Sequence, residues 1–390
     1  MYRILLFSLF WCTSATAQNV GIGTGTPAEK LEVAGAIKIG TTNTPAPAAG
    51  TIRWNPALHD FEGFNGTAWV SLTGGKGAWG NQASYALENG TANHLLGRIN
   101  AAKVGSSYGY SLSTDNIHMV VGAPFDYDEA NANSGKVGSL TFFYWNNHTW
   151  TSSGTFIPSQ YAGDELLGFS VSLAGDRAAA GAPQADINGK VRQGRVLIVS
   201  RPYPQRDDYY ALTSSDGAAS DHFGHSVSFT GTSLLAGAPY KKVGADNWQG
   251  KAYFFTPFLN GWIETEQFTA PDGAANDLFG SAVAQNNSWA AIGAPGATAP
   301  SEKAGKVYLF RRSNNNWTYH GQLSANIHHG SFGSALHLSG DTLVVGAPHN
   351  VPGNTVSIGQ VYVYVRSGTE WNLQATLRAP DAAGGDGFGQ

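Results

Sequence analysis

The chain has 390 residues, a net charge of −4 and only 13% charged residues, whereas 42% are hydrophobic and 50 are glycine. This apolar and aromatic content excludes a disordered chain, and the lack of a basic run argues against nucleic acid as a partner. Abundant glycine and aromatic residues are typical of short strands joined by tight turns, so we expect an all-β protein.

The first segment has the pattern of an export signal. Arg3 supplies a positive charge, an apolar run follows at 4–11, and Ala-Thr-Ala before Gln18 matches the small-x-small rule for cleavage. The run is too short to span a bilayer, and no later stretch is apolar enough to do so. Residues 1–17 are therefore predicted to be a signal peptide, and the protein to be secreted or held at a cell surface. Cys12 is the single cysteine, which favours a bacterial protein over a disulfide-rich extracellular domain.

Two short β-rich elements follow the predicted signal peptide. Residues 18–49 contain alternating apolar runs split by glycine and then a Pro/Ala linker, and residues 50–78 predict a pair of β-hairpins. Both resemble segments that precede tail-fibre-like and surface proteins of bacteria and phages, through VGIGT in the first and FEGFNGTAWVSL in the second. Such strands cannot bury a core alone, so we expect them to trimerise or dock. A fibrous spacer is the alternative.

An internal repeat fills the rest of the chain, and we assign residues 79–390 to it. In five complete copies an aromatic or leucine residue is followed by a glycine, and this glycine precedes the glycine of a Gly-Ala-Pro motif by 13 residues. Successive copies lie 59, 56, 56, 53 and 56 residues apart, so a rigid hairpin is joined by loops of variable length. In the last three complete copies the motif residues are Phe223, Gly224, Gly237, Ala238 and Pro239; Phe279, Gly280, Gly293, Ala294 and Pro295; and Phe332, Gly333, Gly346, Ala347 and Pro348.

Each copy predicts four antiparallel strands. In the third copy HSVSF alternates, SLLAGAP is nearly all apolar, GKAYFFT is aromatic, and a fourth strand begins near Trp262. The proline after Gly-Ala cannot donate to a strand ladder and so ends the second strand. Four strands in about 56 residues, with glycine and aromatics at fixed places, predict one blade of a β-propeller.

The motif residues resemble the FG-GAP repeat of the integrin α-chain propeller, and more closely its bacterial form. The resemblance covers about residues 93–390 and implies a propeller of seven blades that binds ligands. Several integrin-type blades carry a calcium loop of the form Asp-x-Asp-x-Asp-Gly, and no copy here has it. Asp126 and Asp128 come nearest but lack a third ligand and the glycine, and calcium needs six or more oxygens. We therefore expect no cofactor and regard this pair as only a weak metal candidate.

The two ends of the repeat region do not match. A sixth copy starts at Phe388-Gly389, and residues 94–109 look like an orphan fourth strand that leads into the first copy. Since one terminal strand often completes the last blade of a closed propeller, we expect the natural ring to contain at least one more blade. The chain is then a fragment of a longer protein.

Three polar patterns in the sequence contain residue types that catalysis uses. A Gly-x-Ser recurs in three copies, but alanine replaces the serine in the other two, so we expect no catalytic serine and no catalytic residues elsewhere. His222 and His225 are expected to be solvated substitutions in loops, as is the His328-His329 pair. Asp-x-x-x-x-Asp precedes the aromatic-glycine pair in three copies, with Asp164 expected to continue its second position. Because it recurs, we expect it to cap a turn between blades rather than to do acid–base chemistry.

The loops after Gly-Ala-Pro are the predicted binding surface, because they vary on a constant scaffold. The candidate ligand residues are Asp126, Tyr127, Lys241, Lys242 and Trp248. The favoured function is a secreted or cell-surface adhesion protein, not an enzyme, that binds protein or glycan. The alternatives are an accessory propeller of an enzyme whose catalytic part lies outside this chain, and a propeller hydrolase or lyase with its site at the central channel.

Overall fold

The computed structural model describes residues 20–22, 31–33, 51–55, 60–64, 67, 69–71, 105–115, 117–127, 135–146, 150–158, 160, 163–200, 209–298, 304–325, 330–349 and 358–390. The chain divides into two compact units, residues 1–95 and 96–390. The signal peptide, the orphan strand before residue 105 and the boundary expected near residue 79 lie outside the described residues. They remain predictions.

The first unit contains two small sheets. Strands β1 (Val20–Ile22) and β2 (Leu31–Val33) pair in parallel, and β3 (Ile52–Asn55), β4 (Asp60–Phe64) and β5 (Trp69–Ser71) form an antiparallel meander. The meander matches the hairpin pair expected at 50–74. Arg53 bonds Glu62 at 2.8 Å and lies 4.0 Å from the centroid of the Trp69 ring, which ties the three strands together.

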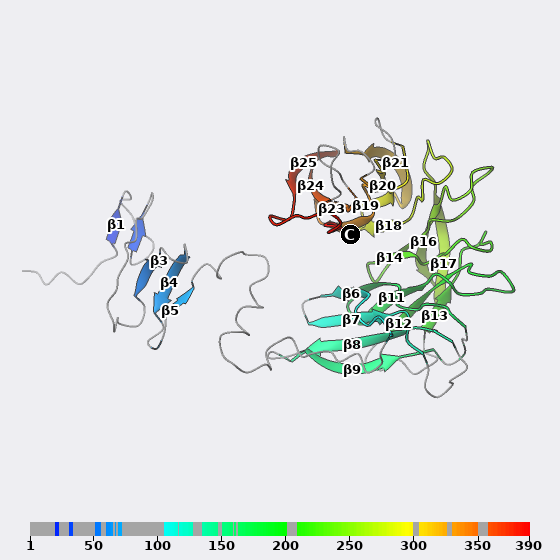
Figure 1. The fold of residues 1–390 in the computed structure, drawn as a ribbon, viewed down its shortest axis with the longest axis horizontal. Coiled ribbons are helices and arrows are strands. Elements are labelled where there is room, and N and C mark those ends of the chain that lie inside the picture. The colour runs from blue at the N-terminus through cyan, green and yellow to red at the C-terminus, as the bar shows by residue number, and fades with distance from the viewer. Residues whose placement is uncertain are drawn as a thin grey trace, which may run out of the picture. The chain divides into compact units, whose positions relative to one another are not determined.

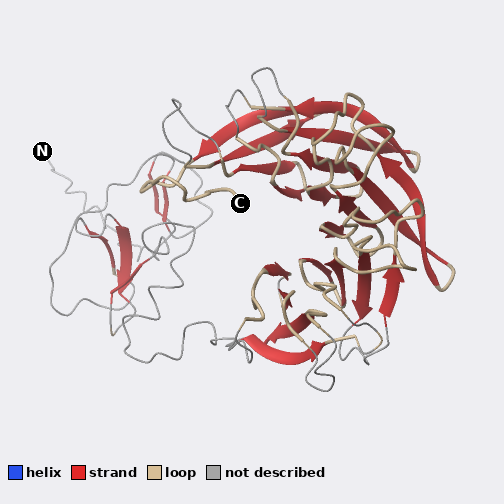
Figure 2. Cartoon of the chain, turned by 45° about the vertical axis from the view of Figure 1, so that its right-hand side comes forward, coloured by secondary structure: helices blue, strands red, loops and turns tan. Residues whose placement is uncertain are grey.

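The second unit is a β-propeller of five blades, each a four-stranded antiparallel meander (Figure 1). The described residues contain no helix, and the blades follow one another around an arc (Figure 2). The blades comprise, in order, β6 (Ser111–Thr114), β7 (His118–Ala123), β8 (Ser139–Trp145) and β9 (Trp150–Phe156); β10 (Ser170–Ala174), β11 (Arg177–Ala182), β12 (Arg195–Ser200) and β13 (Tyr209–Leu212); β14 (Ser226–Phe229), β15 (Leu234–Ala238), β16 (Lys251–Phe258) and β17 (Gly261–Phe268); β18 (Ala282–Gln285), β19 (Trp289–Ala294), β20 (Lys306–Ser313) and β21 (Asn316–Leu323); β22 (Ala335–Ser339), β23 (Thr342–Ala347), β24 (Gln360–Ser367) and β25 (Glu370–Leu377).

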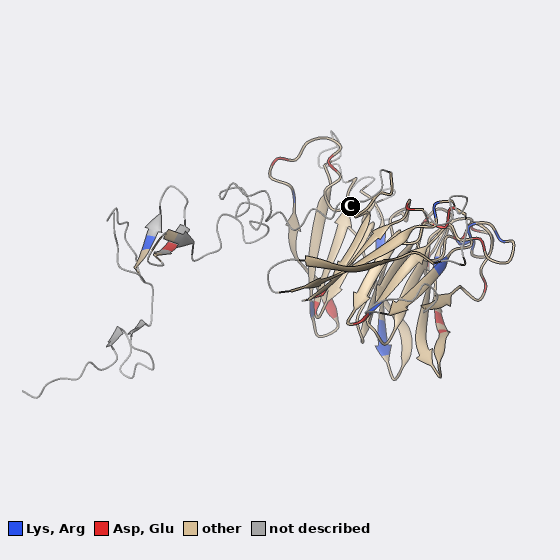
Figure 3. Ribbon diagram, turned by 90° about the horizontal axis from the view of Figure 1, so that it is seen from below, with Lys and Arg blue, Asp and Glu red and all other residues tan. Residues whose placement is uncertain are grey.

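The meander sorts the connections of every blade onto two faces. The turns between the first and second strands and between the third and fourth lie at one end of the strands, which we call the hairpin face. The connections between the second and third strands and between successive blades lie at the other end, the loop face. Charged residues are sparse along the strands and gather in these connections (Figure 3). The predicted binding loops therefore share one face.

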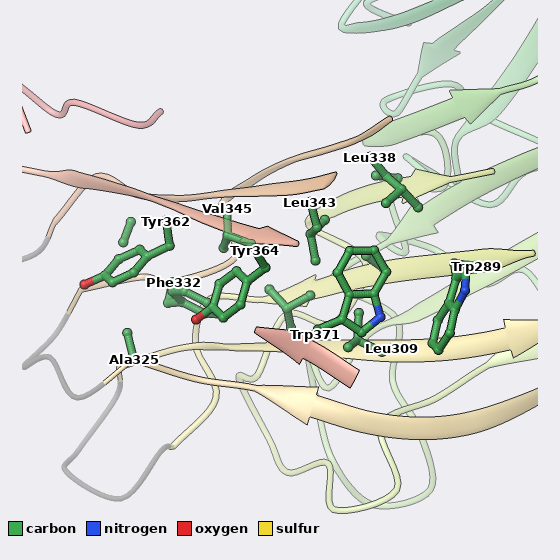
Figure 4. Packing of buried hydrophobic residues seen from close by; sticks show 14 of the residues in the cluster. Trp289, Leu309, Ala325, Phe332, Leu338, Leu343, Val345, Tyr362, Tyr364 and Trp371 are labelled. Atoms are coloured by element: carbon green, nitrogen blue, oxygen red, sulfur yellow. The ribbon is translucent and has the colours of Figure 1, made fainter. Parts of the chain in front are cut away.

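The aromatic-glycine pair of each repeat packs its ring against its own blade and docks its backbone onto the preceding blade. Phe279 is fully buried, and its ring centroid lies 5.4 Å from that of Tyr308. Phe332 packs in the same way against Tyr362 and Tyr364, at 5.3 and 6.3 Å (Figure 4). The backbones of Gly194 and Phe223 form a parallel bridge, as do those of Gly359 and Phe388. The last residues of the chain thus dock on the fifth blade as the other pairs dock on theirs.

Close approach between blades explains why Gly-Ala-Pro begins with glycine. The glycine of the next aromatic-glycine pair has φ near +90° in each repeat, and its carbonyl points at the second strand of the blade before it. A Cβ on Gly293 would lie 2.0 Å from the carbonyl oxygen of Gly333. No side chain fits there, so the glycine that precedes alanine and proline is required by packing between repeats.

The paired aspartates are structural, as expected. The second carboxylate caps a turn: Asp221, Asp277 and Asp386 accept from the backbone N–H three residues earlier, at 2.6–2.8 Å. The first carboxylate joins that turn to the third strand of the blade that follows it. Asp216 accepts from the Tyr253 hydroxyl at 2.7 Å and from the Lys251 ammonium at 2.9 Å, both in β16. Asp272 does the same with Tyr308 and Lys306.

The assignment of Asp164 to the second position of this pattern is wrong. The buried residue two places before the Leu167-Gly168 pair is Glu165, which corresponds to Asp221. Burial raises the pKa of Glu165 to about 7, although Arg195 lies 3.6 Å away and opposes the shift. Asp164 is exposed and accepts instead from the backbone N–H of Lys136 at 2.9 Å.

Candidate functional site: an aromatic row on the loop face

A continuous series of rings crosses the first three blades on the loop face. Tyr110, Phe169 and His225 each follow an aromatic-glycine or leucine-glycine pair, and so stand where the innermost strands begin. The ring centroids of Tyr110 and Phe169 lie 5.0 Å apart, and those of Phe169 and His225 also 5.0 Å apart. Contacts from ring to ring therefore pass from one blade to the next.

The loops after Gly-Ala-Pro extend this series at both ends. Phe125 lies 6.5 Å from Tyr110, and Tyr240 lies 6.2 Å from His225, with both residues directly after the proline of their motif. Trp248 then lies 6.0 Å from Tyr240. We call these six residues the aromatic row: Phe125, Tyr110, Phe169, His225, Tyr240 and Trp248.

The aromatic row is not a requirement of the blade. In blades four and five, Ser281 and Ser334 replace the ring that follows the aromatic-glycine pair. Since those blades have the same four strands and the same docking glycine, the fold tolerates a small polar residue there. Rings in three consecutive blades are thus a property of this surface and not of the repeat.

Two rings of the aromatic row are open to solvent: Tyr110, next to the half-buried Phe125 at one end, and Trp248 at the other end. Tyr110 is 51% exposed and Trp248 is 52% exposed, whereas the other four rings are half-buried. Trp248 has φ of +57°, an uncommon conformation for a bulky residue. Arg192, the equivalent residue of the second blade, has φ of +53°, so this backbone geometry belongs to the repeat while the exposed indole belongs to this loop.

His225, a member of the row, and His222 beside it are half-buried against aromatic rings, so the expectation that both are solvated loop residues is wrong. His225 packs between Phe169 and Tyr240, and its Nδ1 lies 3.3 Å from the carbonyl oxygen of Ser281. Burial lowers its pKa to about 4. His222 lies against Tyr240, with ring centroids 4.8 Å apart, and burial, helped by the charge of Arg192, lowers its pKa as well. Both imidazoles are therefore uncharged at neutral pH.

Lys241 does not reach a ligand, contrary to the expectation from its loop. It is only 6% exposed and forms an ion pair with Asp221 at 2.9 Å, while also donating to the carbonyl oxygen of Asp216. The same position holds buried Asp126, Ala185 and Ala297 in other blades. Its neighbour Lys242 is exposed, as expected, because it lies one residue further along the loop.

Asp126 is likewise an internal residue. Its carboxylate accepts from the Ser139 hydroxyl at 2.7 Å and from the Tyr127 backbone at 2.8 Å. Tyr127 is exposed and keeps its place among the candidate ligand residues, while Asp128 lies outside the described residues. Within the described ranges no three His, Cys, Asp or Glu residues gather as a group that could hold a metal ion.

The repeated serines hold adjacent blades together. Ser111, Ser170 and Ser226 donate to the carbonyl oxygens of Gly168, Gly224 and Gly280, at 2.7, 2.9 and 2.8 Å. Each hydroxyl thus bonds the glycine of the aromatic-glycine or leucine-glycine pair that opens the following repeat. Where alanine replaces the serine, the blade lacks this hydrogen bond. The recurrence that argues against catalysis has a structural origin.

The fold and these contacts define a β-propeller in which the glycine of each aromatic-glycine pair packs against the Gly-Ala-Pro glycine of the preceding blade. The family model described as the FG-GAP repeat matches residues 209–255, 262–310 and 328–364. The β-propeller thus contains three matched FG-GAP repeats, as the sequence motifs indicated. No curated protein matches the chain. Among the described residues no helix is long and apolar enough to cross a membrane.

Two solved structures share part of the fold at low identity. One is a functionally unknown protein from Desulfotomaculum acetoxidans DSM 771, at 10% identity over 71% of this chain and 72% of that one, with a TM-score of 0.42. The other is named a "putative 6-phosphogluconolactonase" from Bacteroides fragilis NCTC 9343, at 13% identity over 87% of this chain and 81% of that one, also with a TM-score of 0.42. At these TM-scores neither structure bears on the function of this chain.

Proposed function

We propose that this protein is a non-catalytic binding and adhesion protein, secreted or held at a cell surface, that contacts its ligand with the loop face of the propeller. The observation that carries the proposal is the aromatic row, whose rings occur in three blades and are exposed at Tyr110 and Trp248. Exposed aromatic residues with a rigid backbone are typical of binding hot spots.

Two further observations support a binding role. FG-GAP propellers are generally binding folds, and FG-GAP repeats occur in extracellular proteins. Ser226 and Asp221, which belong to the recurring polar patterns, and the candidate ligand residue Lys241 are all engaged in contacts within or between blades. The sequence pattern of residues 1–17 favours export, and the segment after it favours display away from the surface.

A binding screen with face-specific variants tests the proposal. The full chain is presented to immobilised extracellular proteins, peptides and glycans, beside Tyr110→Ala and Trp248→Ala on the loop face. Phe258→Ala, at a hairpin-face tip and 55% exposed, is the matched control. We expect at least one ligand whose binding falls in both loop-face variants and is unchanged in the control. Ligands that depend only on the hairpin face, or none at all, would contradict the proposal.

A further inference from the structure

The chemistry of the aromatic row narrows the class of ligand. The six rings offer flat apolar surfaces, and four of them also carry a polar group: the phenols of Tyr110 and Tyr240, the imidazole of His225 and the indole of Trp248. Burial raises the pKa of Tyr110, so its phenol stays protonated and able to donate. The neutral imidazole of His225 donates its Nδ1–H to the carbonyl oxygen of Ser281, so its Nε2 is left as an acceptor. The row thus combines stacking surfaces with both kinds of hydrogen-bonding group.

Carboxylates lie beside two basic residues near the row, each hydrogen-bonded to the backbone N–H of the basic residue. The Lys136 ammonium lies 5.2 Å from the centroid of the Phe125 ring, and the carboxylate of Asp164 accepts from the backbone of that lysine. Arg192, whose charge acts on His222, donates its backbone N–H to Asp186 at 2.8 Å. Neither sign dominates, so the surface complements an uncharged ligand better than a polyanion or a polycation.

The spacing of the row favours a polymer with a repeating unit. The propeller places Tyr110, Phe169 and His225 at equivalent positions of three successive blades, with the same 5.0 Å step between neighbouring rings. A ligand with one apolar face per unit, and with hydroxyls that both donate and accept, matches this series. Sugar rings in a chain have this character, whereas proline-rich peptides offer carbonyl acceptors and no donor at proline.

We propose that the aromatic row binds an uncharged polysaccharide, whose sugar faces stack on the exposed rings of Tyr110 and Trp248 and whose chain follows the half-buried rings between them. This inference rests on the proposed function and names its ligand class. The sugar hydroxyls exchange hydrogen bonds with the phenol, imidazole and indole groups along the row.

Affinity electrophoresis of the full chain tests the inference. The gels contain a soluble neutral β-glucan, a mannan, or an alginate as the charged comparator, and a polyproline peptide is titrated separately. We expect at least one neutral polysaccharide to retard the protein, and Tyr110→Ala and Trp248→Ala each to weaken binding about tenfold, since a stacked ring is worth roughly one power of ten in affinity. Tyr110→Phe, which keeps the ring, is expected to retain binding within about threefold, and Phe258→Ala to bind as the wild type. Thermal melts of every variant establish that the fold is kept.

The other outcomes separate this inference from the proposed function. If only alginate or polyproline binds, and the row variants lose that binding, the polysaccharide inference is overturned while the loop-face function stands. If no neutral polysaccharide retards the protein, the inference is overturned as well. If nothing in the wider screen depends on the row, both proposals fail.

Discussion

Replacing Gly293 by alanine tests the packing between blades most severely. The new Cβ would lie 2.0 Å from the Gly333 carbonyl oxygen and 3.0 Å from its carbonyl carbon, and both are backbone atoms that cannot rotate away. Because an ordinary carbon contact needs roughly 3.5 Å, blades four and five must separate by more than about 1 Å. A gap of that size forfeits a quarter to a half of each dispersion contact across it. Overpacking of this kind costs typically ~1–3 kcal/mol, and we expect the upper end.

Gly321→Ala is the matched control within the same blade. Gly321 lies in β21, has no atom within 4 Å of its would-be Cβ, and is not in the left-handed region. Alanine there is expected to be neutral or to stabilise by up to ~1 kcal/mol, because glycine is entropically unfavourable in a strand.

Urea unfolding, followed by circular dichroism and tryptophan fluorescence, measures the two variants. We expect Gly293→Ala to lower the transition midpoint markedly and Gly321→Ala to leave it unchanged or raise it. Equal midpoints for the two variants would refute the argument that the glycine of Gly-Ala-Pro is fixed by the carbonyl of the next repeat.

Three further changes probe other contacts, each by the same unfolding assay. Ser226→Ala removes the bond to the Gly280 carbonyl and is expected to cost about 1 kcal/mol without affecting ligand binding; lost binding with intact stability would contradict its structural role. Asp221→Ala leaves the Lys241 ammonium buried without its nearer carboxylate and should cost about 3 kcal/mol. Lys241→Ala should cost clearly less, because Ala297 occupies the equivalent position of the next blade, where Asp277 still caps its turn; equal costs would argue against this. His225 titrates near 4 in the folded protein and 6.5 in the unfolded chain, so its contribution to stability is present above pH 6.5 and is lost as the pH falls through 4, to a total of roughly 3 kcal/mol. His225→Phe introduces the residue found at the equivalent position of the preceding blade, and it should remove this loss of stability relative to the wild type. Glu165, whose pKa is raised to about 7, changes stability with pH in the opposite direction in both proteins and so cancels from the comparison.

The repeat itself could be predicted from the sequence because its signals are local. The fixed interval between the aromatic-glycine pair and Gly-Ala-Pro is the length of one hairpin, and the four predicted strands of each copy appear as β6 to β25. The capping role of the aspartates also followed from recurrence, since a turn that repeats needs the same cap each time.

The binding surface could be predicted only in part, because burial depends on how blades meet. Lys241 lies in a loop, but its position is occupied by alanine in two other repeats, Ala185 and Ala297, and that substitution pattern was the available sign of burial. The aromatic row was missed because its members are far apart in the sequence. The signal was the residue after each aromatic-glycine pair, which changes from Tyr110 and Phe169 to serine along the chain.

The central claim is that the loop face of the first three blades is where this protein meets its ligand. Hydroxyl-radical footprinting of the full chain, with and without the ligand selected by the screen, tests it most directly. We predict that ligand protects Tyr110 and Trp248 from oxidation and leaves Phe258 and Leu259 on the hairpin face unchanged. Protection confined to Phe258 and Leu259, with Tyr110 and Trp248 oxidised as before, would contradict the account.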